Sequence, residues 1–468
     1  MSIHEQIEEE RRCSLPKAEE VKAFRQYARG RHPSTLTTGQ QRILRGLLGN
    51  LFCDNVCKRI LQELRNRLRL VRFDLSTDGQ GERSIGTYLE SVWVKNGLAA
   101  KSAAVHWAMF RDGNTAIALN WSKDRVVITR ERWWNGKTGM FVSYDDDDRV
   151  NYAVKEWTTR EGLRRTVYYP DKIERYIQDN TTANNDGWRM YKLPSDPQGD
   201  GPIEWKDRRG QPLGVPVVHF ANIQVPNDGD GDDGTEEPDP HYGMSELDGG
   251  MLGLQDEVND IHRDLSGAAR FAGFPMMKGT GIKEERDENG NLKNPLIVEP
   301  GAFFTDENPQ ADFDVIQPGS LAELERILGI KLQAMTRAAA VPLHLIAGDW
   351  PSGEALLRAE MPLIDKVETV GASVGPSWAS VAHKAVQMSN AFGQTSFDEE
   401  AMITAEFAPV ARRDPLTLAG VAERLAKFVG QRETLRILNY SPKDIQRIID
   451  DLKENPPQGS QTREGGNL

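Results

Sequence analysis

The sequence predicts an α+β chain that is mainly helical and folds as several lobes of one subunit. Apolar residues recur at helical spacing over several long stretches, whereas short β-like runs gather between about residues 71 and 225. Gly- and Pro-rich segments separate these regions. A chain of 468 residues is long enough for two to four domains or for one elongated subunit.

The composition excludes several classes of protein. Only 38% of the residues are hydrophobic, so much of the surface is expected to be polar or buried against partners. The net charge of −12 argues against a tight, sequence-reading nucleic-acid binder. Three cysteines exclude a disulfide scaffold, and no apolar run approaches the ~18 residues of a membrane span. The N-terminus lacks the apolar core of a signal peptide, so we expect a soluble protein made in a reducing cytoplasm.

The first part of the chain is basic. Residues 1–72 hold 15 Lys or Arg and 8 Asp or Glu, although residues 1–19 show no core and are expected to be disordered. Residues 40–70 predict an amphipathic helix whose basic face could contact phosphates. A solvated face, or one paired with acidic neighbours, is the favoured interpretation. Cys53 and Cys57 are expected to be buried structural thiols, with no nearby histidine to complete a metal site.

Short strands and aromatic residues fill the next region. Eight of the ten tryptophans fall between Trp93 and Trp205, which favours an aromatic α+β core over a sugar-binding platform. His106 and His219 lie in strand-like apolar surroundings and are predicted to be hydrogen-bonded core residues. The acidic run 228–239 has Asp233 and Asp239 where a calcium loop needs Gly and Glu, so we predict a solvated loop and no metal site.

The most regular helical pattern begins near residue 245. Apolar residues alternate at spacings of four and three, which predicts a narrow seam on a helix at 245–272. The seam residues are Leu247, Met251, Leu254, Val258, Ile261 and Leu265. A second helix is expected at 321–340, after a Gly- and Pro-rich insert with β-like runs at 273–320. Such a protruding hairpin buries little by itself, so its seams are expected to meet neighbours, including other subunits.

No pattern for catalysis or cofactor binding is present. Gly348 and Gly353 have the spacing of a phosphate loop, but Glu354 and Ala355 stand where Lys and Ser or Thr are needed. No HExxH or CxxC motif occurs. The sequence therefore predicts no enzyme, no cofactor and no metal. A long helix at about 354–392 and a helical C-terminal region complete the chain, before a disordered tail at 456–468.

The order of several motifs resembles the SPP1-type family of tailed-bacteriophage portal proteins. The motifs are His241-Tyr-Gly-Met-Ser-Glu-Leu247, Leu254-Gln-Asp-Glu-Val-Asn259, Ala272-Gly-Phe-Pro275, Val341-Pro-Leu-His-Leu345 and Pro351-Ser-Gly-Glu-Ala-Leu-Leu357. The resemblance covers about residues 20 to 455, and its specificity lies in the order and spacing of these segments.

The resemblance implies a portal fold with five named parts. These are a wing at 20–244 to which part of 354–409 returns, stem helices at 245–272 and 321–340, a clip at 273–320, a tunnel loop at 341–353 and a crown at 410–455. It also implies a ring, usually of twelve subunits, at one capsid vertex of the virion, assembled in the host cytoplasm. Double-stranded DNA would pass through the ring during packaging and ejection.

The resemblance further implies partners and DNA-facing residues. The partners would be the terminase large subunit and a head–tail adaptor, both docking at the clip, and the major capsid and scaffolding proteins, with no membrane. In the tunnel loop His344, Asp349, Trp350 and Ser352 would face DNA. An acidic channel gives few counterion-release contacts, so DNA would slide. Lys331 and Arg337 could add rings of positive charge, or pair with acids at the surface or between subunits.

Two other functions remain open from the sequence. A metal-dependent hydrolase could use the acidic run 228–239, and another virion connector, such as an adaptor or capsid component, could use the same helices. The long hairpin with its insert favours the portal ring over both.

Overall fold

The architecture is α+β, as predicted. A computed structural model describes residues 3–33, 53–75, 80–145, 147–179, 187–193, 201–222, 241–248, 250–273, 276–281, 308–316, 320–348, 353–411, 422–425, 428–437 and 442–454, with isolated positions at 39, 288–289 and 351. The chain divides into two compact units, Met1–Ala408 and Pro409–Leu468. Among the helices described, none has the length and apolarity needed to cross a membrane.

A three-stranded antiparallel sheet lies at the centre of the first unit. Its order is β10 (Val217–Ala221), β2 (Asn114–Ser122) and β3 (Arg125–Glu131). The helix α5 (Leu98–Asp112) packs on β2 and also contacts α3 (Val56–Arg67), while α4 (Gln80–Asn96) lies next to the strand β1 (Leu70–Leu75). The first half of the helix expected at 40–70 lies outside the described residues, and its second half is α3.

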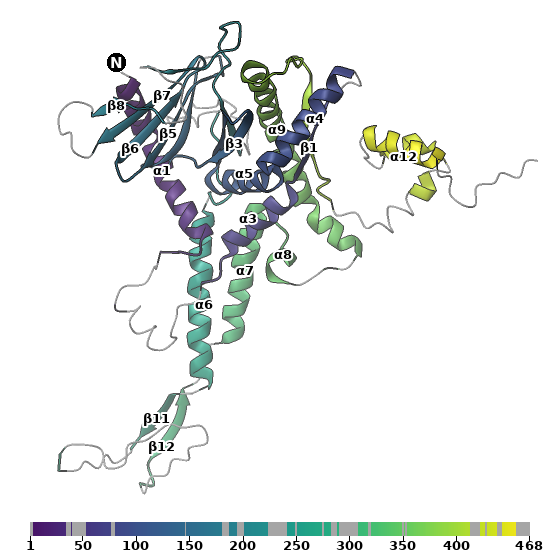
Figure 1. The fold of residues 1–468 in the computed structure, drawn as a ribbon. Helices are drawn as coiled ribbons and strands as arrows, with labels where there is room; N and C mark the ends of the chain where they lie inside the picture. Colours follow the sequence, from purple (N-terminus) through teal and green to yellow (C-terminus); the bar gives the residue numbers. More distant parts are fainter. Residues whose placement is uncertain are drawn as a thin grey trace, which may run out of the picture. The chain divides into compact units, whose positions relative to one another are not determined.

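A larger antiparallel sheet carries the N-terminal helix (Figure 1). Its strands are β4 (Gly139–Tyr144), β5 (Val150–Thr158), β6 (Gly162–Tyr168), β7 (Lys172–Asp179) and β8 (Trp188–Met190), with β9 (Ile203–Glu204) beside β7. The helix α1 (Ile3–Ala28) places Ile7, which is fully buried, against Tyr152, Val154 and Val167.

The disorder expected for residues 1–19 was wrong, because a buried ionic network fastens α1 to this sheet. Arg165 is fully buried and donates to Glu156 on β5 and to Glu8 on α1, at 2.5 and 2.8 Å. Arg11 on α1 also contacts Glu156. Glu8 and Arg11, two of the charges that give the N-terminus its disorder-like composition, are therefore paired with the sheet and hold the helix against it.

The long helix α9 (Gly353–Phe392) joins these layers despite two internal prolines, Pro362 and Pro376. It packs against β10, β2, α4 and β13 (Ile403–Phe407), which pairs with β1. Trp378 is fully buried at its centre. One apolar cluster combines α4, α9, β1 and β13, and its buried members are Leu75, Ile85, Leu89, Ala382, Val386, Ala401 and Ile403.

A long helical hairpin with a β insert follows the central sheet in the chain. It consists of α6 (Met251–Gly273), the hairpin of β11 (Met276–Thr280) and β12 (Asp312–Ile316), and α7 (Leu321–Ala339). The helices α6 and α7 lie side by side (Figure 1). The short helix α8 (His344–Ala347) then connects α7 to α9.

The second unit is described by two short helices, α11 (Gln431–Ile437) and α12 (Pro442–Glu454), which contact each other. The last helix begins at a proline, Pro442, whose missing N–H and fixed φ suit the first helical position. Ile445 is buried between these helices, whereas Phe428 is 86% exposed.

The two histidines predicted to be core residues are buried and hydrogen-bonded. His106 lies on α5 instead of a strand; its Nε2 accepts from the Trp378 indole, so its Nδ1–H donates to the Leu68 carbonyl. His219 on β10 meets Asn114 and the Tyr144 hydroxyl. Burial lowers the pKa of His106 to about 4 and that of His219, with a smaller effect of His241, to about 3.

These histidines predict a loss of stability in mild acid. Both have pKa values below the ordinary 6.5, so their stabilisation is complete above pH 6.5 and is lost as the pH falls toward 4. The free energy of unfolding should fall by up to about 1.4 kcal/mol per pH unit for each histidine. Urea unfolding at pH 7.5, 6 and 5 measures this slope. The His219→Gln variant keeps polar contacts without titrating, and an unchanged slope in that variant would contradict the assignment.

Candidate functional site

The antiparallel helices α6 and α7, here called the helix pair, are the candidate functional element. The predicted seam largely faces inward: Leu247, Met251 and Val258 are buried, and Leu254, Ile261 and Leu265 are half-buried. Helix α7 has the expected bounds, and Ser320 caps it by accepting from the Glu323 backbone N–H. Helix α6 begins at Met251 instead of the predicted residue 245, so Leu247 precedes the helix.

The later start of α6 has a physical cause in its preceding segment. Residues 243–246 bond to the central sheet and α5 instead of forming a helical turn. Met244 N–H donates to the Asn222 carbonyl, Glu246 N–H to the Phe110 carbonyl, and the Ser245 hydroxyl to the Arg111 carbonyl. A side chain on Gly243 would collide with the backbone of Asn222, so this close approach requires glycine.

Polar side chains on α6 fix its first turns to the N-terminal helices. Gln255, fully buried, accepts from Cys57 N–H and donates to the Asp54 carbonyl on the α3 side, at 3.0 and 2.6 Å. Asp256 accepts from the Tyr27 hydroxyl of α1 at 2.6 Å. The segment 243–259 with these contacts is the root of the helix pair. Two motifs that carry the family resemblance lie in this root.

The cysteine predictions were half correct. Cys57 is buried, and burial raises the pKa of its thiol to about 12. Cys53 is exposed, and its Sγ lies 3.1 Å from Nδ1 of His32, which contradicts the expectation that no histidine is near. Partial desolvation of the sulfur, together with the nearby Asp54 and Asp256 carboxylates, raises the pKa of Cys53 as well, which favours the protonated thiol.

An ion pair joins the two helices of the pair. Lys331 on α7 lies 2.6 Å from the Glu257 carboxylate on α6. Of the two candidates for a basic ring, Lys331 is therefore already neutralised inside the subunit. Arg337 is exposed and makes no ion pair with any residue of the described ranges.

The segment after α7 turns sharply at Ala340. This residue has a left-handed backbone (φ 54°), and the N–H groups of Ala340 and Val341 close the end of α7 on Arg337 and Thr336. Such a cap normally carries glycine. The chain then enters α8.

His344, one of the residues expected to face DNA, is buried within the single subunit. It is 5% exposed, and its Nε2 lies 3.6 Å from the Glu360 carboxylate on α9. Glu360 also pairs with Arg67 on α3 at 2.8 Å, and Arg59 donates to the Leu345 carbonyl. Burial raises the pKa of Glu360, but Arg67 and His344 outweigh it, so the net pKa is lowered. The other three predicted loop residues, Asp349, Trp350 and Ser352, lie outside the described residues.

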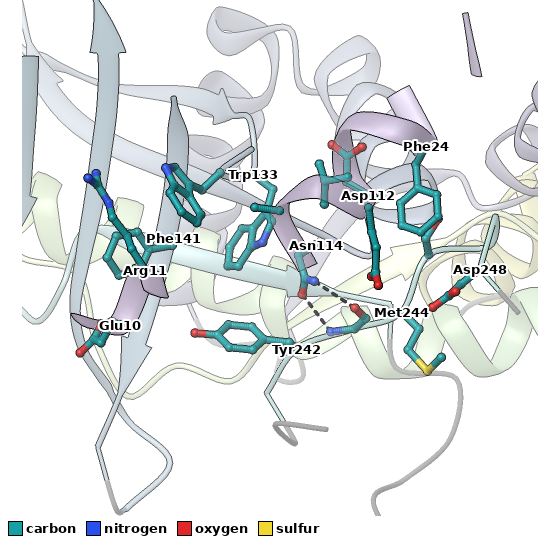
Figure 2. A pocket seen from close by; sticks show the side chains of 16 residues that line it. Glu10, Arg11, Phe24, Asp112, Asn114, Trp133, Phe141, Tyr242, Met244 and Asp248 are labelled. Atoms are coloured by element: carbon teal, nitrogen blue, oxygen red, sulfur yellow. Dashed lines mark hydrogen bonds between the residues drawn. The ribbon is translucent and has the colours of Figure 1, made fainter. Parts of the chain in front are cut away.

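A hollow of about 280 Å³ lies between α1, the sheets and the root (Figure 2). Asn114 crosses it, donating to the Gly243 carbonyl and accepting from the Gly243 N–H. Asp112 faces Arg25 of α1 at 2.8 Å. Asn114 and Asp112 are therefore already hydrogen-bonded within the subunit. Within the described residues no group of three metal-ligating side chains occurs, and the acidic run 228–239 lies outside them.

Sequence reasoning missed the residues that hold the root and α8. Arg67 and Glu360 are 293 positions apart, and no local pattern pairs them. Gln255 and Asn259 gave a weak signal, because they interrupt the apolar face of α6 at helical spacing. A buried amide at such a place predicts a polar partner on a neighbouring element.

Comparison with known proteins was made over the whole chain. Residues 87–456 match the family model described as "Phage portal protein, SPP1 Gp6-like". Two solved structures, "Neck of empty GTA particle computed with C6 symmetry" and "Virion of native gene transfer agent (GTA) particle", are similar over 88% of this chain and 96% of theirs. Their identities are 14% and 15%, with TM-scores of 0.41 and 0.38. No curated protein matches.

The family match defines the class of protein as a structural component of phage-like virions, not an enzyme family. The chain belongs to the SPP1 Gp6-like family of phage portal proteins, since the match covers far more than half of its length. It is a portal, the connector protein at a capsid vertex. The resemblance inferred from the sequence is thereby confirmed.

The buried charges beside α8 predict a costly substitution. Glu360→Gln removes the negative charge that Arg67 and His344 face and should lower the free energy of unfolding by about 2–3 kcal/mol, because a poorly solvated Arg67 loses its counterion. Urea unfolding measures the change. Glu323→Gln, which affects the exposed pair with Arg326, is the matched control and should change little. Equal effects of the two substitutions would contradict the role of Glu360.

The cap of α7 predicts a stabilising substitution. Ala340→Gly removes the steric cost of the left-handed backbone and should raise the free energy of unfolding by about 0.5–1 kcal/mol. Thermal unfolding of the full chain measures this. Ala339→Gly, one position earlier in the helix, should instead destabilise. A loss of stability in Ala340→Gly would show that another contact holds this turn.

Proposed function

We propose that the chain forms a ring at one capsid vertex and serves as the conduit for double-stranded DNA during packaging and ejection. Membership in the portal family supports this proposal. The observation that carries it for this chain is the helix pair with its β-hairpin insert. These helices leave much of their surface uncovered within the subunit, and copies arranged around an axis would cover it.

In this proposal each region has a role in the ring. Residues 20–244 form the wing, and part of 354–409 returns to it. The helices at 245–272 and 321–340 form the stem, with the clip at 273–320 between them. Residues 341–353 form the tunnel loop, and 410–455 form the crown. The N-terminal α1 belongs to the wing, because its ionic network attaches it to the larger sheet.

Weak contact with DNA follows from the charge. A subunit of net charge −12 lines a channel that repels phosphates, so few counterions are released and DNA slides. Asp349, Trp350 and Ser352 remain the proposed DNA-facing residues of the tunnel loop. His344 serves instead to anchor α8 through Glu360. The Lys331–Glu257 ion pair makes the surface of the stem nearly neutral at the position of these two residues.

The proposed partners follow from position in the virion. The clip would dock the terminase large subunit during packaging and the head–tail adaptor afterwards. The wing and crown would contact the major capsid and scaffolding proteins as the particle assembles in the host cytoplasm. Twelve subunits are proposed. The force for packaging would come from ATP hydrolysis by the terminase.

The ring is tested on the purified full-length protein. Native mass spectrometry and negative-stain imaging should show closed rings of one dominant subunit number, twelve in this proposal, with a central opening. A protein that stays monomeric or dimeric across salt and protein concentrations would contradict the proposed function. A ring of another size would correct only the subunit number.

A further inference from the structure

A second hollow, of about 820 Å³, opens where α7, α8 and α9 meet. Most of its lining is apolar. The apolar residues are Ala340, Val341, Pro342, Leu343, Pro351, Ala359 and Pro362. The exposed Arg337 lies at its edge and has no acidic partner among the described residues. We call this hollow the α7–α9 groove.

The first turns of α9 also carry an exposed ridge. Leu357 and Met361 are 56% and 55% exposed, although both are large and apolar. Asp365 and Glu368 continue the same stripe, are exposed, and have no ion-pair partner in the described part of the chain. The spacing of four, four and three keeps all four residues on one flank of the helix. The ridge is therefore apolar at one end and acidic at the other.

The ridge and the groove lie on different flanks of α9. With about 100° per residue, Ala359 and Pro362 point well away from the Leu357 and Met361 stripe. The remaining face, with Leu363 and Val367, is buried in the subunit. A ridge and a groove on two flanks of one helix cannot meet within one molecule, but they can meet between copies in a head-to-tail contact.

We propose that the ridge of α9 in one subunit seats in the α7–α9 groove of the next. Leu357 and Met361 fill the apolar hollow, and Asp365 and Glu368 face Arg337 of the neighbouring copy. The contact covers the apolar side chains that are exposed in a single subunit. It also places the Arg337 guanidinium next to the carboxylates of Asp365 and Glu368. Because the contact is heterologous, its repetition forms a ring when the rotation between neighbouring subunits closes. This inference rests on the proposed ring and assigns the residues that hold it together.

Charge reversal and its rescue test the proposal on the full-length chain. Arg337→Glu and the double variant Asp365→Arg/Glu368→Arg should each lower the fraction of protein in rings by about tenfold or more at equal concentration. The triple variant, with all three charges reversed, should recover rings. Arg160→Glu, the same charge change at an exposed turn, is the matched control and should assemble like the wild type. Circular dichroism verifies that each variant is folded.

The apolar end of the ridge is tested separately. Leu357→Glu should also disperse rings, whereas Val94→Glu, at a more exposed apolar residue of α4, should leave them intact. Rings in Arg337→Glu at the wild-type fraction would overturn the inference and leave the ring proposal standing. A triple variant that stays dispersed while both parent variants are dispersed would overturn the Arg337 pairing. A wild type without rings would overturn the proposed function itself.

Discussion

The structure depends on the root, where backbone polar groups fix a helix pair that cannot stabilise itself. Two narrow helices bury too little apolar surface to hold their own direction, so their orientation is set where they leave the body of the subunit. Gly243 allows the chain to approach Asn222, and the Ser245 and Glu246 contacts then fix the start of α6. Gln255 extends this fixation to α3. A buried polar group without a hydrogen-bond partner is costly, so this network favours the one orientation of α6 in which these hydrogen bonds form.

Charge pairing performs the same task at the other attachments. Arg165 and Glu156 fasten α1, Arg67 and Glu360 fasten α8, and Lys331 and Glu257 join the helix pair. The Arg67–Glu360 and Lys331–Glu257 pairs link elements that are distant in sequence, whereas Arg165 and Glu156 lie on the neighbouring strands β6 and β5. Three arginines of the basic N-terminal region are paired inside the subunit, Arg11 with Glu156, Arg25 with Asp112 and Arg67 with Glu360. These cations hold elements of the subunit together instead of forming a basic surface.

The sequence predicted what local patterns determine. The helix expected at 321–340 agrees with α7 to within one residue, because a periodic apolar stripe is read from neighbouring residues. The same reasoning placed the start of α6 six residues too early, because the Ser245 hydroxyl and the Glu246 N–H donate to carbonyl groups of α5. Residues 1–19 appeared disordered because the partners of their charges, Glu156 and Arg165, lie more than a hundred positions away. The contact of His344 with Glu360 was not predicted for the same reason, since Glu360 belongs to another helix.

Different sides of the helix α9 serve the core of the subunit and the proposed contact between subunits. Its buried face, with Leu363 and Val367, is fixed by the subunit core, and Glu360 on the same side holds α8. Only one side of the helix packs against the core, so its other sides remain available for other contacts. Leu357 and Met361 remain more than half exposed on another side of the helix. Only 38% of the residues in the chain are hydrophobic, so two large apolar side chains on an exposed side of one helix need an explanation. A surface that a neighbouring copy covers explains the position of Leu357 and Met361.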